Sequence, residues 1–262
     1  EPVWGAQFVP PVMNAGLIPG TLSLSKFART GSMRSFLDFY AFRNNFFFID
    51  DFNGDAINLD YWAVANSGGG SAADFAVNVQ NGTGNIRSDT GTTDNGSTSM
   101  IGPIIYRGDN NAGMWVRLKL DAVTSCEWEV GFIDAVPGSN GPAFSAVAPT
   151  AVAANAAVLH MDTDESTAAL DLMHFLTVGS TANQDAKATT TGLAPTAATY
   201  VDVVVQLVGN DAFCIVNGGQ AQITHNNGIS GNAAGHVEGG VSLAPWVYNR
   251  TRSTTPVLMD VD

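Results

Sequence analysis

The fold of this 262-residue chain is decided by residues 49–62, which read Ile49-Asp50-Asp51-Phe52-Asn53-Gly54-Asp55-Ala56-Ile57-Asn58-Leu59-Asp60-Tyr61-Trp62. An aspartate-rich turn comes first, a Gly-Asp corner follows, and the stretch closes on Leu-Asp-x-Trp. Asp, Asn and Gly favour turns because they bond to their own backbone or accept positive φ angles. The preceding residues have a different composition, with several Pro and many aromatic side chains, so this stretch opens a second unit of the chain.

The residues after this stretch alternate between apolar and polar side chains, which is the period of a β-strand. In residues 112–120 the even positions are apolar and face one side, whereas Trp115 and Arg117 face the other. Further strands are predicted at 157–161, 169–178, 200–208, 212–216, 220–224, 237–243 and 256–261. Short strands separated by turns indicate an antiparallel sandwich.

Residues 126–134 show the same alternation, but their polar positions are acidic. Trp128, Val130 and Phe132 are predicted to face inward, and Glu127 and Glu129 outward. The simplest interpretation is a pair of acidic side chains on a solvated face. Cys126 begins this strand; with Cys214 it is predicted to be a buried, reduced thiol, because two cysteines are too few for a disulfide scaffold.

Together these segments resemble concanavalin A-like jelly-roll sandwiches, the fold of legume lectins, laminin G-like modules and laminarinase-type glucanases. The resemblance rests on residues 50–62, on Trp115, on residues 127–134 and on the closing residues 258–262. It implies an all-β, antiparallel jelly-roll β-sandwich over residues 48–262, preceded by an extended N-terminal arm over residues 1–47.

Composition excludes several classes of function. A formal charge of −13 disfavours nucleic acid as a partner, because phosphate binding needs a basic surface. The apolar runs are too short or too interrupted to cross a membrane. Walker loops, dinucleotide-binding fingerprints and Gly-x-Ser-x-Gly elbows are absent from the sequence, so no cofactor is expected. The chain starts at Glu-Pro without Met and stops within a strand-like run, so we expect residues beyond both ends.

The arm, residues 1–47, differs from the rest in charge. It holds four basic and two acidic residues, a net +2, which leaves −15 for the remainder. Pro and Gly exclude a long helix at its start. Its aromatic side chains either fold back on the sandwich or pack against another subunit, since such a surface would promote aggregation of a free monomer. The residues predicted to dock the arm onto a partner are Arg29, Arg34, Phe36, Phe39, Tyr40, Phe42 and Arg43.

The acidic strand is the candidate for enzymatic chemistry. Laminarinase-type glucanases carry a Glu-x-Asp-x-x-Glu strand, in which two carboxylates about 5–5.5 Å apart serve retaining hydrolysis. By this resemblance Glu127 matches the first position and Glu129 stands where the family has Asp. The last acid would fall on Phe132, or on Gly131 or Ile133 one residue away, and none of these can donate a proton. The sequence therefore predicts that the chain is not an enzyme.

Glycan binding without hydrolysis is the second candidate. Sugars bind through aromatic faces and convergent polar groups, and the predicted platform for them comprises Trp115, Arg117, Glu127, Glu129 and His160. No catalytic or metal site is predicted, although Asp162, Asp164 and Glu165 form a candidate Ca²⁺ loop, because hard cations prefer clustered carboxylates.

The extended aromatic arm, the acidic body and the abundance of Ala, Thr, Gly and Asn resemble virion proteins of tailed bacteriophages. The resemblance implies a non-enzymatic capsid decoration or accessory protein, located in the virion and docked through its arm. Its expected partners are other capsid or tail proteins, in a homo-oligomer or multi-copy assembly, with a glycan as a further candidate. The alternatives are a glycan-binding tail or fibre module and a laminarinase-like glycoside hydrolase.

Overall fold

The computed structural model describes residues 52, 57–68, 74–77, 85–136, 141–144, 152–164, 172–179, 187–225 and 237–262. The arm and its docking residues lie outside these ranges. No helix among the described residues is long and apolar enough to cross a membrane.

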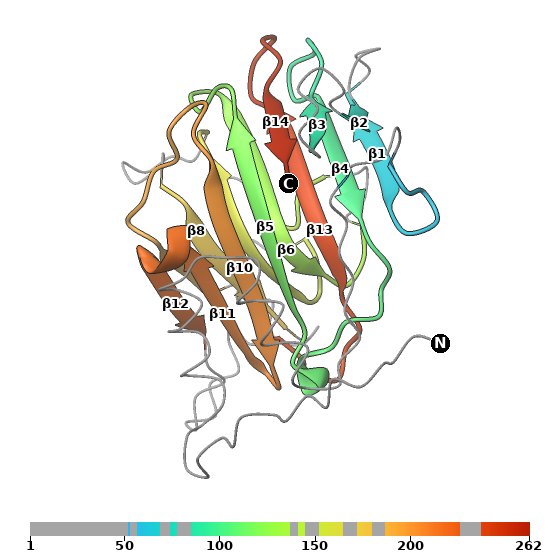
Figure 1. Cartoon of the computed structure of the whole chain (residues 1–262), viewed down its shortest axis with the longest axis vertical. Coiled ribbons are helices and arrows are strands. Elements are labelled where there is room, and N and C mark those ends of the chain that lie inside the picture. The colour runs from blue at the N-terminus through green and yellow to red at the C-terminus, as the bar shows by residue number, and fades with distance from the viewer. Residues whose placement is uncertain are drawn as a thin grey trace, which may run out of the picture.

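The described residues form two antiparallel sheets of seven strands each, stacked as two layers (Figure 1). Sheet A has the order β1-β4-β13-β6-β7-β8-β9. Its strands are β1 (Ala63–Ser67), β4 (Ser97–Ile101), β13 (Ala244–Thr251), β6 (Cys126–Ile133), β7 (Ala156–Asp162), β8 (His174–Val178) and β9 (Lys187–Thr190). This architecture confirms the all-β jelly-roll prediction.

Sheet B has the order β12-β11-β10-β5-β14-β3-β2 and lies in front in Figure 1. Its strands are β12 (Ala221–His225), β11 (Asp211–Val216), β10 (Val201–Val208), β5 (Gly113–Leu120), β14 (Leu258–Val261), β3 (Ile86–Asp89) and β2 (Asp74–Val77). Two short 3₁₀ helices, η1 (Gly108–Asn110) and η3 (Asn217–Gly219), lie in its connections.

The main core lies between the sheets. Even-numbered side chains of β5 and β6 point into it, among them Leu118, Trp128 and Phe132, which are fully buried as the alternation predicts. Both cysteines are free and buried, which confirms their predicted state. Burying these large apolar side chains contributes about 1.5–3 kcal/mol each.

A second apolar cluster lies on the opposite, outer face of sheet A. Phe144 and Trp246 are fully buried there, with Ile133 and Tyr248. Ala143 and Phe144 contribute to this cluster, so this part of the outer face of sheet A is covered rather than solvated. The covered outer face is the feature that positions the candidate site.

Eight of the fourteen described strands lie within a few residues of predicted positions, β1, β2, β3, β4 and β9 lie where no strand was predicted, and one prediction is wrong. Residues 237–243 were expected to be a strand, whereas the strand is β13, which begins at Ala244 and contains Pro245. Proline cannot donate a ladder hydrogen bond and argues against a central strand in sequence reasoning. Here the Pro245 carbonyl still accepts a hydrogen bond from the Gly102 N–H at 2.9 Å.

Candidate functional site

Charged side chains from neighbouring strands meet on the outer face of sheet A. The strand register places Glu127 of β6 opposite Asp162 of β7 and Arg250 of β13. It also places Glu129 opposite His160. Residues directly opposite in antiparallel strands share a face, so these side chains converge. The charge cluster, as we call it, comprises Glu127, Glu129, His160, Asp162, Arg250 and Arg252.

Glu129 is fixed in place by four donors. Its Oε2 accepts hydrogen bonds from the Ala143 N–H at 2.7 Å and the indole Nε1–H of Trp246 at 2.9 Å. Its Oε1 accepts one from the Phe144 N–H at 3.0 Å and lies 3.2 Å from Nδ1 of His160. The side chain is 0 % exposed. Glu129 therefore clamps residues 143 and 144 onto the sheet.

Glu127 is buried in a different electrostatic setting. Its Oε2 lies 3.0 Å from Nη2 of Arg252 and 3.2 Å from Nη1 of Arg250. Its Oε1 is buried without a hydrogen-bond partner among the described residues. Burial raises the pKa of Glu127 to about 7, although the positive charges of His160 and Arg252 oppose this shift. At neutral pH this carboxyl is therefore partly protonated.

Asp162 and His160 complete the charge cluster. Arg252 binds Asp162 through two hydrogen bonds, one of them from Nε to Oδ1 at 3.0 Å. Burial alone would lower the pKa of His160, but its bond to Glu129 and the nearby carboxylates raise it above the ordinary value. A charged imidazole is therefore favoured beside the three buried carboxylates.

Strand β6 lacks the third acid that the glucanase-like strand carries. Gly131, on the same face of β6, has a φ of +155°, and a Cβ there would lie 2.1 Å from the Ala157 carbonyl oxygen. A carboxylate side chain has no room at this position. Phe132 points into the main core. Strand β6 therefore carries two acids and no third.

Metal-ligating geometry is present but a guanidinium already lies there. Ligand atoms of Glu127, His160 and Asp162 lie within 4.8 Å of one another. Arg252 binds both of these carboxylates and supplies the positive charge that a cation would bring. In the predicted Ca²⁺ loop, Asp162 faces Arg252, the Asp164 side chain is 57 % exposed, and Glu165 lies outside the described residues.

A second group of side chains lies on the outer face of sheet B. The guanidinium carbon of Arg117 lies 5.9 Å from the ring centre of Trp115 and 5.6 Å from that of Tyr200. Lys119 Nζ lies 4.9 Å from the Tyr200 ring centre, and Arg117 Nε lies 2.9 Å from Asp202 Oδ1. The aromatic platform, as we call it, comprises Trp115, Arg117, Lys119, Tyr200 and Asp202. Tyr200 and the Arg117 side chain are each 39 % exposed.

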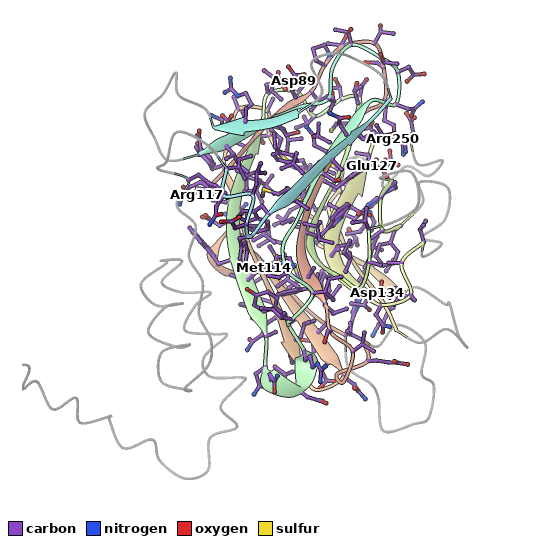
Figure 2. All side chains as sticks on the ribbon, turned by 90° about the vertical axis from the view of Figure 1, so that its right-hand side faces the viewer. Asp89, Met114, Arg117, Glu127, Asp134 and Arg250 are labelled. Carbon is purple, nitrogen blue, oxygen red and sulfur yellow. The ribbon has the colours of Figure 1, made fainter. Side chains whose placement is uncertain are left out.

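The predicted glycan platform is therefore divided between two faces. Trp115 and Arg117 project from sheet B, whereas Glu127, Glu129 and His160 project from sheet A on the other side of the sandwich. Figure 2 shows Arg117 on one side and Glu127 with Arg250 on the other. The prediction that Glu127 and Glu129 share the outward face of β6 is correct, but the face is not solvated, since both are 0 % exposed.

Sequence reasoning missed several residues of both regions. Arg250 and Arg252 repeat at the strand period, as Glu127 and Glu129 do, and this matching spacing was an available signal. Nothing local in the sequence pairs Tyr200 with Arg117, because their contact depends on β10 lying beside β5.

Several solved structures share the fold of this chain at low sequence identity. An endo-β-1,3(4)-glucanase of glycoside hydrolase family 16 matches with a TM-score of 0.53 at 14 % identity, covering 81 % of this chain and 86 % of the other. A β-1,3-glucanase from Mycobacterium marinum gives 0.55 at 12 % identity, covering 83 % and 97 %. A pseudo-β-1,3-glucanase of Mycobacterium tuberculosis gives 0.53 at 11 % identity, covering 82 % and 95 %. No family model matches the sequence, and no curated protein resembles it in sequence.

These comparisons correct two predictions. The expectation of a capsid decoration protein of a tailed bacteriophage is wrong: the similar structures are glucanases and a pseudo-glucanase. The prediction that the chain is not an enzyme is also contradicted, because it rested on the missing third acid while active glucanases share this fold. At these identities the comparisons establish the jelly-roll fold itself.

Proposed function

We propose that this chain binds glycans through the aromatic platform on sheet B. One observation carries the proposal. On a partly exposed part of the surface, the guanidinium carbon of Arg117 lies 5.6 Å from the ring centre of Tyr200 and 5.9 Å from that of Trp115. Sugar rings stack on aromatic faces, and their hydroxyls need donors and acceptors at the rim. Arg117 and Lys119 supply donors, and Asp202 supplies an acceptor.

The platform is also preorganised for binding. Arg117 is held by Asp202 at 2.9 Å and lies over both rings, and Lys119 is held by Asp260 at 2.9 Å. Side chains that are already ordered lose little entropy when a ligand arrives. The similarity of the fold to glucanases supports a glycan over other ligands of the same shape, and the net charge of −13 disfavours nucleic acids.

Isothermal titration calorimetry against a panel of soluble oligosaccharides and polysaccharides tests this proposal. Tyr200→Ala and Trp115→Ala are expected to weaken binding by more than about tenfold, the effect of removing a central aromatic contact. Val152→Ala is the matched control, because Val152 is 52 % exposed and precedes β7 of the other sheet. The proposal fails if no glycan binds, or if binding survives both aromatic substitutions.

Hydrolysis at β6 is a second candidate, favoured by the state of Glu127. A carboxyl with a pKa of about 7 holds a proton near neutral pH, as a general acid must. Glu127 also stands at the first acidic position of the glucanase-like strand. Glu127 and Glu129 are both 0 % exposed, so a substrate reaches Glu127 only if the side chains that cover it move aside.

Release of reducing ends from β-glucans and mucin-type O-glycans tests this candidate. Turnover by the parent protein that is lost in Glu127→Gln, while glycan affinity at the aromatic platform is unchanged, supports it. If the parent releases no reducing ends across the panel between about pH 5 and about pH 8, the range that brackets this carboxyl's titration, hydrolysis at β6 is excluded.

A further inference from the structure

Each cation in and beside the aromatic platform is already paired with a carboxylate. Arg87 binds Asp260 through Nε at 2.7 Å and Nη2 at 3.0 Å, and Lys119 binds the same carboxylate at 2.9 Å. Arg117 is paired with Asp202. Asp260 is 2 % exposed, so it lies beneath its two cations rather than beside them.

The pairing follows from the strand register. Asp260 of β14 lies opposite Lys119 of β5 on one side and Arg87 of β3 on the other. Asp202 lies opposite Arg117. Each cation therefore meets a carboxylate directly across the ladder, where opposite charges stabilise the sheet. The pKa values of Arg87 and Lys119 are raised mainly by their hydrogen bonds to Asp260, so both remain charged.

Carboxylates outnumber cations on this face. Besides Asp202 and Asp260, three more lie at its edges. Asp262 exchanges backbone hydrogen bonds with Arg117 at 2.8 Å, Asp89 lies opposite Leu258, and Asp121 Oδ1 accepts from the Leu258 N–H at 2.8 Å. Among the described residues around the aromatic platform, three cations, Arg87, Arg117 and Lys119, thus lie among these five carboxylates.

An acidic sugar meets two obstacles here. Its carboxylate or sulfate group would have to displace Asp202 from Arg117, which leaves a partly buried charge without its partner. It would also approach a face with excess negative charge. A neutral sugar meets neither obstacle, because its hydroxyls can donate to Asp202 and accept from Arg117 without breaking the ion pair.

We infer that the aromatic platform selects neutral glycans and rejects uronic or sulfated ones. This inference rests on the proposed function and specifies its ligand class. The selectivity arises from the paired charges, whereas the affinity arises from the two rings.

A matched ligand pair tests the inference on the full chain. Polygalacturonate and its fully methyl-esterified form share a backbone and differ in charge, and calorimetry measures both, beside a neutral β-glucan. The neutral forms are expected to bind at least about tenfold more tightly than the acidic form, a preference that shrinks as salt rises from about 50 to about 500 mM.

The variant Asp202→Asn sharpens the test. It removes one negative charge and frees Arg117, so the ratio of acidic-form affinity to neutral-form affinity is expected to rise by about tenfold. Acidic binding as tight as neutral binding in the parent overturns the inference and leaves the proposed function standing. Absence of binding by every form overturns both.

Discussion

The two outer faces of the sandwich carry similar residue types, which are buried on one face and exposed on the other. On sheet A, Glu129 and His160 are 0 % and 1 % exposed, and the carboxylate binds backbone N–H groups of residues 143 and 144. On sheet B, Arg117 and Tyr200 are each 39 % exposed. Charged and aromatic side chains thus form a buried clamp on one face and an accessible platform on the other. The difference between the two faces is the burial of these side chains.

The energetic consequences differ in the same way. A buried charge that loses its partners is strongly destabilising, whereas an exposed ion pair contributes about 0–1 kcal/mol. Substitutions in the charge cluster should therefore change stability, and substitutions in the aromatic platform should change binding.

Glu129→Ala should have the largest effect on stability. It removes the acceptor for Ala143, Phe144 and Trp246 at once and leaves buried donors unsatisfied. The expected loss in free energy of unfolding is about 4 kcal/mol, measured by urea denaturation. Asp164→Ala, an acid with a 57 % exposed side chain nearby, should change stability little. A loss below about 1 kcal/mol for Glu129→Ala would mean that the clamp contributes no more than an exposed pair.

The pH dependence of stability should come next in size. The pKa of Glu127 is raised from 4.5 to about 7, so the folded state binds this proton more tightly than the unfolded state. This stabilisation is present below about pH 4.5 and is lost as pH rises through about 7, by up to about 3 kcal/mol. Glu127→Gln should flatten the decline, which urea denaturation at several pH values measures. An unchanged slope would locate the titrating group elsewhere.

Gly131→Ala tests how closely β6 and β7 approach beneath the charge cluster. The added methyl would lie 2.1 Å from the Ala157 carbonyl oxygen, so the strands must shift, at a cost of about 2 kcal/mol. Gly192→Ala is the control, because Gly192 also has a positive φ but open space around it. Thermal unfolding of both variants separates crowding from backbone strain. Equal losses would show that crowding plays no part.

Local periodicity predicted which side chains of a strand point outward, but not on which sheet of the sandwich that strand lies. Alternation in β5 and β6 correctly placed Trp115 and Arg117 outward, and likewise Glu127 and Glu129. It could not tell that β5 and β6 belong to different sheets, because that depends on pairing with β10 and β13. Trp115 and Glu129 therefore lie on opposite faces of the sandwich and cannot form a single platform.

The burial of the acidic pair was equally beyond a local pattern. A charged residue alternating with apolar ones normally faces water, and that expectation held for Lys119 and Arg117, which are partly exposed, but not for Glu129. What covers Glu129 is residues 143 and 144 together with Trp246, more than a hundred residues later in the chain. Only the tertiary fold brings these donors to one carboxylate.

Arg117→Gln should have the smallest effect on stability and therefore defines the platform side of the comparison. It breaks the ion pair with Asp202 on a partly exposed surface, where screening by water limits the loss to under about 1 kcal/mol. Binding of neutral glycans should still weaken, because the variant loses the cation that lies over both rings. Urea denaturation and calorimetry on the same preparation measure both quantities. If stability falls as far as in Glu129→Ala, Arg117 is a structural residue, and the contrast between clamp and platform does not hold.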